Sequence, residues 1–139
     1  MANTRRKART IALQALYEVD SAARAPETVV ERLLAGAALS EENMAFVREL
    51  VAGTVNNRDK IDRQIRKFAP AWPLEQIAMI DRNILRLAIF EILFNNKVPV
   101  EVAVSEAVEL AKGFGSESSS KFVNGVLGSV STLADRKKA

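Results

Sequence analysis

The chain has 139 residues, of which 48% are hydrophobic, so it carries enough apolar material to fold as one ordinary globular domain. It contains no cysteine and no histidine, which excludes disulfide frameworks, thiol nucleophiles, zinc sites built on these residues and the usual general base near neutral pH. The net charge is only +3, but the cations are grouped as nucleic-acid binders group them. The groups are Arg5, Arg6, Lys7 and Arg9; Arg58, Lys60, Arg63, Arg66 and Lys67; and Arg136, Lys137 and Lys138.

Apolar residues recur at a helical period through the first half of the chain. Their spacing predicts helices over residues 4–22, 28–37 and 41–55, and a fourth that follows Asn56-Asn57 and stops at the Pro70-Ala-Trp-Pro73 segment. Pro26 suits the start of the second helix, and Ser40 suits the N-cap of the third.

The second half of the chain continues this pattern. Residues 74–95 predict a fifth helix that is apolar nearly all round between Ile84 and Leu93, as in the middle of a bundle. Residues 98–104 alternate like a strand, but a helix ending near Gly113 fits too, and we favour the helix because a lone strand has no partner. A last helix covers 119–134. We therefore predict an all-α fold, a compact bundle of six to seven helices in a single domain over residues 1–139.

The sequence predicts neither export nor membrane insertion. No long apolar run follows the basic N-terminus, as a signal peptide would require. The most apolar stretch, residues 84–94, is interrupted by Arg86 and Glu91 and is too short to span a bilayer. We expect a soluble cytoplasmic protein that has no membrane partner.

One arc of the first predicted helix combines cations with the only tyrosine of the chain. A helical wheel predicts a core face centred on Ala8, Ala12, Ala15 and Val19. The opposite arc carries Arg6, Lys7, Thr10, Gln14 and Tyr17. Exposed aromatic rings stack on unpaired bases, and Arg and Lys neutralise phosphates. An ordinary solvated face with a partly buried tyrosine is the alternative.

A second candidate segment is residues 118–125, Ser-Ser-Ser-Lys-Phe-Val-Asn-Gly. Its serines can cap a helix N-terminus, where backbone N–H groups favour an anion such as a phosphate. Lys121 adds charge and Asn124 can hydrogen-bond a base edge. The alternative is a serine-capped helix whose Phe122 lies in the core.

The sequence offers little to catalysis. Glu106 and Glu109 lie three residues apart on a predicted helix but have no flanking His or Asp, so we interpret them as surface charge. Gly113-Phe-Gly115 lacks the further glycine and the preceding strand of a dinucleotide-binding loop. We expect no catalytic residue, metal or cofactor, and no enzyme activity.

Four segments together resemble the NusB family of transcription antitermination factors. They are RRKAR at 5–9 with ALQALY at 12–17; ILRLAIFE at 84–91; Val98-Pro99 with EAVELAK at 106–112 and Phe114-Gly115; and KFVNGVL at 121–127. They cover nearly the whole chain in the family's order. Two positions depart from the family: Phe90 stands where many members have tyrosine, and Ser118 stands where an acidic residue is common, which removes a negative charge that bears on RNA affinity.

The resemblance implies an all-α fold in two small helical subdomains and binding to boxA RNA of ribosomal operons. It implies NusE, a ribosomal protein of the small subunit, and the RNA polymerase antitermination complex as partners, and it allows a homodimer. The RNA-binding residues it implies are Arg5, Arg6, Lys7, Arg9, Gln14, Tyr17, Lys121, Phe122 and Asn124, together with Arg82 and Arg86 of the central helix.

Two other functions compete with this one. A NusB-like domain precedes the catalytic domain of certain ribosomal-RNA cytosine methyltransferases, but that enzyme needs a downstream α/β domain and a catalytic cysteine, and this sequence stops at Ala139 without a Cys. A helical module that binds only protein is the other rival. Retention of RNA binding after removal of the basic arm would favour it.

Overall fold

The computed structural model describes residues 2–138, and the side chains of residues 5–134. Within that range the chain forms seven α-helices, a 3-10 turn, a π-helical turn and no strand, so the predicted all-α class is confirmed. The chain divides into two compact units, residues 1–56 and 57–139, in agreement with the two subdomains that the family resemblance implies. Neither unit's described helices are long and apolar enough to cross a membrane.

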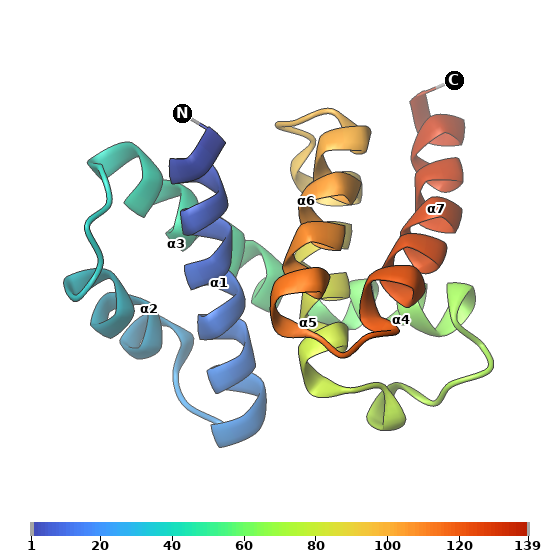
Figure 1. The fold of residues 1–139 in the computed structure, drawn as a ribbon, viewed down its shortest axis with the longest axis horizontal. Coiled ribbons are helices and arrows are strands. Elements are labelled where there is room, and N and C mark those ends of the chain that lie inside the picture. Colours follow the sequence, from blue (N-terminus) through green and yellow to red (C-terminus); the bar gives the residue numbers. More distant parts are fainter. Residues whose placement is uncertain (1, 139) are drawn as a thin grey trace. The chain divides into compact units, whose positions relative to one another are not determined.

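The first unit consists of three helices that all contact one another, α1 (Ala2–Ala22), α2 (Pro26–Ala35) and α3 (Glu41–Asn56) (Figure 1). Pro26 occupies the first turn of α2, and the Asn43 N–H donates to Ser40 Oγ over 3.2 Å, so both predicted helix starts are confirmed. The core contains Ala8, Ile11, Ala12, Leu13, Ala15 and Leu16 of α1, Val29, Val30 and Leu34 of α2, and Phe46, Val47, Leu50 and Val51 of α3.

Exposed ion pairs join the helices of this unit around its rim. Arg32 of α2 pairs with Glu18 of α1, and Arg48 of α3 binds Glu31 of α2 through two nitrogen atoms at 2.8 and 3.0 Å. The hydrogen bonds from Arg48 hold the pKa of Glu31 below its ordinary value. These pairs are solvent-exposed, so they orient the helices more than they stabilise the fold.

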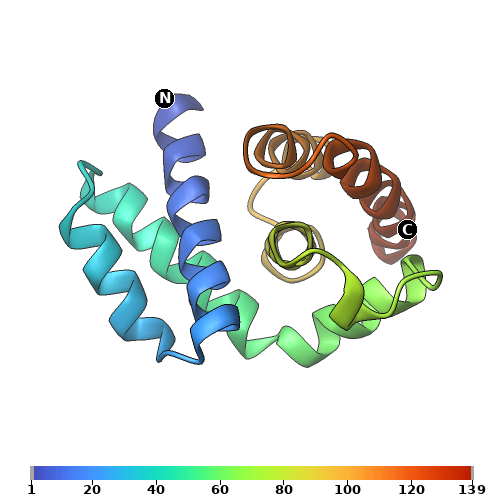
Figure 2. The ribbon, with the colours of Figure 1, turned by 60° about the horizontal axis from the view of Figure 1, so that its bottom comes forward.

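The second unit is built around α5 (Met79–Ile89), which contacts α4 (Arg58–Phe68), α6 (Val100–Phe114) and α7 (Ser119–Lys138). Figure 2 looks nearly along α5 and shows these three helices arranged around it. Ile84, Leu85, Leu87, Ala88 and Ile89 are all buried, so the prediction that this segment is the centre of a bundle is confirmed.

The prediction of one helix over 74–95 is wrong in detail. Residues 74–95 contain a 3-10 turn, η1 (Leu74–Gln76), an extended link at Ile77 and Ala78, then α5 and the π-helical η2 (Phe90–Asn95). Residues three apart lie on the same side of a 3-10 turn, so Leu74 and Ile77 both point into the core. Asn96 has a left-handed backbone with φ 56°, which ends η2.

The segment with strand-like alternation is helical, as favoured. Pro99 precedes the first turn of α6, and Val100, Ala103 and Ala107 are buried at helical spacing. The last helix also runs longer than the predicted 119–134, to Lys138. The side chains of the basic tail, 136–138, lie outside those described, so the structure does not place this predicted cation group.

Candidate nucleic-acid interface

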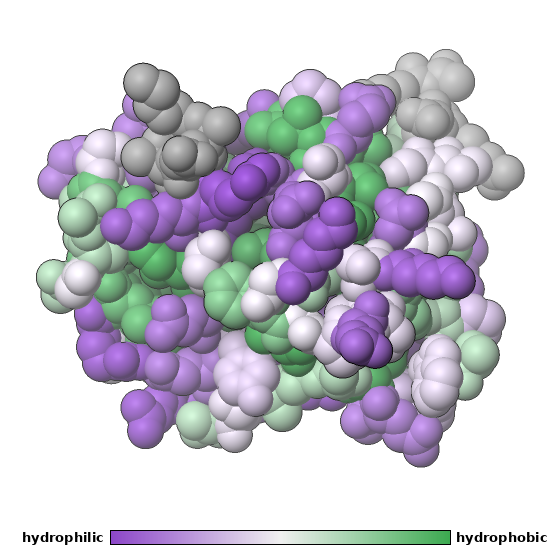
Figure 3. Space-filling view, in the orientation of Figure 1, coloured by the Kyte–Doolittle hydropathy of each residue, from purple (hydrophilic) through white to green (hydrophobic). Residues whose placement is uncertain are grey.

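The face of α1 that points away from the core of the first unit carries cations and polar side chains beside an aromatic ring. Arg6, Lys7 and Gln14 are exposed, and Tyr17 is 41% exposed. Figure 3 shows hydrophilic side chains over the N-terminal half of α1. The predicted wheel is therefore confirmed for Ala8, Ala12 and Ala15, which face inward, whereas Val19 and Thr10 are half-buried. A ring suitable for stacking shares the outer arc with two positive charges.

The other two arginines of the N-terminal cluster contact the Phe46 ring of α3. Arg5 lies with its guanidinium carbon 4.0 Å from the centre of the Phe46 ring and with Nη2 3.6 Å from Glu42. Arg9 is only 4% exposed, and its guanidinium carbon lies 5.3 Å from the same ring. Both make cation–π contacts that anchor α1 to α3. Arg6 and Lys7 are therefore the most exposed cations of this cluster, whereas Arg5 has 39% of its side chain exposed and Arg9 is buried.

In the second unit, the first turns of α7 present the predicted closing motif. Lys121 and Asn124 are exposed and Phe122 is half-buried, while Val123, Val126 and Leu127 enter the core. Part of the Phe122 ring is therefore accessible. The helical pattern alone also allowed this ring to lie in the core.

The Ser119 side chain fixes the loop before α7, whereas Ser116 and Ser118 are exposed. Ser119 is buried, and its hydroxyl accepts a 2.9 Å hydrogen bond from the Ser116 N–H, which closes the loop on itself. A Cβ at Gly115 would lie 2.4 Å from the Ser119 side chain and 2.9 Å from the Ala111 carbonyl oxygen, so this close approach requires glycine. The loop therefore holds the start of α7, and with it Lys121 and Phe122, in a defined position.

The two arginines of α5 differ in availability. Arg82 is half-buried and donates from Nη1 to the Leu74 carbonyl oxygen over 3.3 Å. Arg86 is 3% exposed and donates from Nε and Nη2 to the two carboxylate oxygens of the buried Asp62, over 2.8 and 3.1 Å. This paired fork joins α5 to α4. Arg86 therefore has a structural role in the second unit and does not present its charge to solvent.

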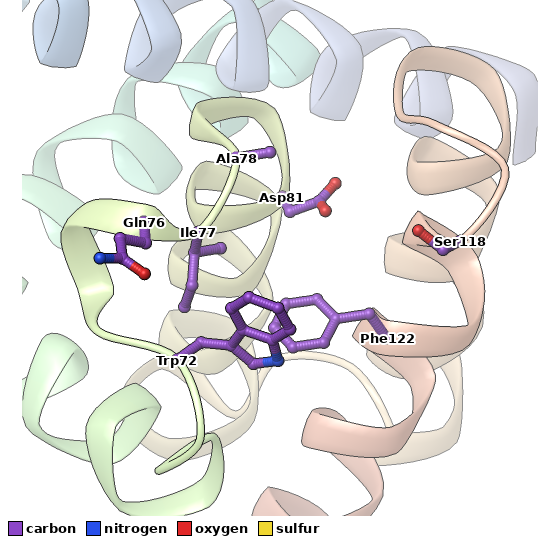
Figure 4. Close-up of a pocket in the computed structure, with 7 residues that line it drawn as sticks. All are labelled: Trp72, Gln76, Ile77, Ala78, Asp81, Ser118 and Phe122. Atoms are coloured by element: carbon purple, nitrogen blue, oxygen red, sulfur yellow. The ribbon is translucent and has the colours of Figure 1, made fainter.

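Sequence reasoning missed a pocket of about 300 Å³ beside Phe122 in the second unit (Figure 4). Trp72, Gln76, Ile77 and Ala78 line one side, from the loop before α5; Asp81 of α5, and Ser118 and Phe122 at the start of α7, complete it. The signal in the sequence was the chain's only tryptophan, which lies 56% exposed between Pro70 and Pro73. The helical pattern alone predicts only a helix stop for that segment.

The exposed side chains of the described residues include groups that bind nucleic acid. Among the described residues, no group of three or more Asp or Glu side chains gathers as metal ligands would. What the described surface offers is aromatic rings, exposed cations and hydrogen-bonding side chains, which are the groups that stack on bases, neutralise phosphates and bond base edges.

The sequence matches the NusB family model over residues 6–132. A transcription antitermination protein NusB of Dehalococcoides mccartyi is 55% identical over 99% of this chain and 97% of its own length. Another, of Chloroflexus aggregans, is 46% identical over 99% of this chain and 94% of its own.

Solved structures give the same result for the fold. T. maritima NusB is 33% identical and superposes with a TM-score of 0.86, covering 92% of this chain and 90% of that one. A crystal structure of the antitermination factors NusB and NusE in complex with double-stranded RNA contains a chain that is 25% identical and superposes with a TM-score of 0.87. That match covers 96% of this chain and 99% of the other.

Proposed function

Because the chain belongs to the NusB family, we propose that it is a transcription antitermination factor that binds boxA-type single-stranded RNA of ribosomal operons together with NusE. The family match extends over residues 6–132, and the relatives are matched over nearly their full lengths. A similar chain is found with NusE and double-stranded RNA in a solved structure, which supports NusE and an RNA as partners here, while the preference for a single strand rests on the exposed aromatic ring described next.

The observation that carries RNA binding is the outer face of α1. Arg6 and Lys7 supply exposed positive charge, and Tyr17 supplies an exposed ring along the same helix face. Cations position the phosphate backbone without reading sequence, whereas stacking rings require bases that are not paired. This combination favours a single strand over a duplex.

The start of α7 adds base-reading groups to the proposal. Lys121 and Asn124 are exposed, and Phe122 presents part of its ring beside them. Arg82 belongs to this proposal as a half-buried cation on α5. Arg9 and Arg86 enter it as anchoring residues, because both are buried.

We further propose that the protein works in the cytoplasm as a binding factor and not as an enzyme. NusE would complete the RNA surface and the complex would join transcribing RNA polymerase. The exposed groups of the described residues support this role, because they are ones that bind RNA. The buried ion pair between Arg86 and Asp62 holds α5 against α4.

Salt dependence tests the contribution of α1. Each phosphate neutralised on a single strand contributes about 0.7 to the slope of log affinity against log salt concentration. Replacing Arg6 and Lys7 together by alanine should therefore reduce the magnitude of that slope by about 1.4, with an unchanged helical circular dichroism spectrum. The measurement is a fluorescence-anisotropy titration of labelled single-stranded RNA at several salt concentrations.

Arg63 and Arg66 provide a matched control, because they are exposed cations on α4 and their joint replacement removes the same charge. That control variant should keep most of the slope. An equal reduction of the slope in both double variants would show that RNA binding depends only on net charge. An unchanged slope in the α1 variant would show that RNA binds at another surface of the protein.

A further inference from the structure

The pocket beside Phe122 has the chemistry of a site for one flat, hydrogen-bonding ring. Trp72 and Phe122 contribute aromatic rings to its wall, and Gln76 and Ser118 contribute polar groups (Figure 4). Its volume of about 300 Å³ is at the small end of ligand pockets, which suits a single ring more than an extended ligand.

Asp81 gives the pocket a polar group with unused bonding capacity. It is 8% exposed and lines the pocket, and its Oδ1 is buried and accepts no hydrogen bond. Figure 4 shows the carboxylate extending from α5 toward the side of Ser118. Leaving a buried acceptor unpaired costs free energy, so a ligand that donates a hydrogen bond here would remove a cost that the free protein carries.

The backbone that carries both aromatic rings is held by neighbouring structure. Trp72 lies between Pro70 and Pro73, and its backbone N–H donates a hydrogen bond to the Ala69 carbonyl oxygen over 3.2 Å, while Phe122 belongs to the first turn of α7, after the loop closed by Ser119. A backbone fixed in this way needs less ordering when a base stacks on the rings, which favours binding.

We propose that this pocket takes one unpaired base of the bound RNA and selects a base whose Watson–Crick edge carries an amino group, cytosine over uracil. The inference rests on the proposed RNA-binding function and adds Trp72 and Asp81 to it as base-selecting residues. Stacking on Trp72 and Phe122 would accept any base, because every base has a π-face.

Asp81 supplies the selection. A carboxylate accepts a hydrogen bond from the N4 amino group of cytosine. Uracil has a carbonyl oxygen at that position. Its ring N–H lies between two carbonyl oxygens, and the negatively charged carboxylate repels both oxygens. A negative charge close to a polyanion also lowers affinity for RNA in general. Asp81 is therefore useful to binding only where it meets a donor.

The test compares two short single-stranded RNAs of equal length, one of uracil alone and one with interior cytosines. Trp72 is the only tryptophan of the chain, so quenching of tryptophan fluorescence reports this pocket directly. We expect stronger quenching by the cytosine RNA and an affinity about fivefold or more above that for the uracil RNA.

Asp81→Asn should remove this preference, because an amide carries both a donor and an acceptor and can pair with uracil. The variant should bind the uracil RNA more tightly than the parent does and the cytosine RNA less tightly. Glu75→Gln is the matched control, since it removes one negative charge from the adjacent exposed turn and should keep the preference. The ratio of two affinities does not depend on how much of a variant is folded.

The outcomes separate the pocket from the proposed function. Equal affinities and equal quenching by both RNAs, with salt-dependent binding intact, would overturn the pocket and leave the RNA-binding function standing. Absence of any RNA binding would overturn both. If Asp81→Asn instead lost NusE binding in the absence of RNA and kept the cytosine preference, the pocket would take a protein side chain, which also overturns this inference.

Discussion

Arg86→Ala is expected to lower the free energy of unfolding by about 3–5 kcal/mol. The substitution leaves Asp62 buried with only Arg58, whose Nε is 3.8 Å from Oδ2 and which is itself half in solvent. The carboxylate would lose both hydrogen bonds from the Arg86 fork and could not be rehydrated inside the second unit. Denaturant unfolding followed by circular dichroism measures the loss.

A double variant distinguishes loss of the ion pair from loss of side-chain volume. Replacing Arg86 by Met and Asp62 by Leu removes both charges and retains apolar bulk, so it should recover most of the stability that Arg86→Ala loses. Because the fork is buried, this double variant should also retain RNA affinity. A stability loss below about 1 kcal/mol for Arg86→Ala would contradict the structural role, and a double variant that is stable but fails to bind RNA would return Arg86 to the RNA surface.

NusE is expected to tighten binding of this chain to boxA-like RNA by about tenfold or more, a coupling of about 1.4 kcal/mol. The described surface offers few base-reading groups, and each contributes about 1–3 kcal/mol before the cost of ordering the strand is met. If a partner adds contacts beside these base-reading groups, the cost of ordering the strand is offset by the contacts of both proteins. By thermodynamic linkage, boxA RNA must tighten NusE binding by the same factor.

Tyr17 provides the variant that separates the two binding partners. Its ring is exposed, so Tyr17→Ala should lower RNA affinity without disturbing the core and should leave NusE binding nearly unchanged when RNA is absent. Phe122→Ala is the less clean probe because that ring is half-buried. Loss of NusE binding in Tyr17→Ala without RNA would assign the α1 face to the protein partner.

The helical period predicted most of this fold because each helix buries a stripe of its own surface. The exception lies between Trp72 and Met79, where Leu74 and Ile77 have helical spacing but belong to a 3-10 turn and an extended link. A period of apolar residues does not distinguish these geometries when both residues point into the same core. For Asn96, the sequence predicted the end of a helix but not the left-handed backbone that ends it.

The candidate site was predicted less completely than the fold. The outer face of α1 was predicted from the helical wheel, although the wheel alone also allowed a partly buried Tyr17. The roles of Arg9 and Arg86 did not, because their partners Phe46 and Asp62 are 37 and 24 residues away in sequence. The pocket at Asp81 was missed for the same reason, because its walls come from two segments far apart in sequence, residues 72–81 and residues 118–122.

The most direct test of the account is a titration of labelled boxA RNA with this chain in the presence of NusE, beside a scrambled RNA of the same length and composition. Because phosphate contacts do not depend on sequence, only base contacts can separate the two RNAs. We expect the boxA RNA to bind the pair of proteins more tightly than the scrambled RNA does, by about tenfold or more. Equal affinity for the two RNAs would contradict it.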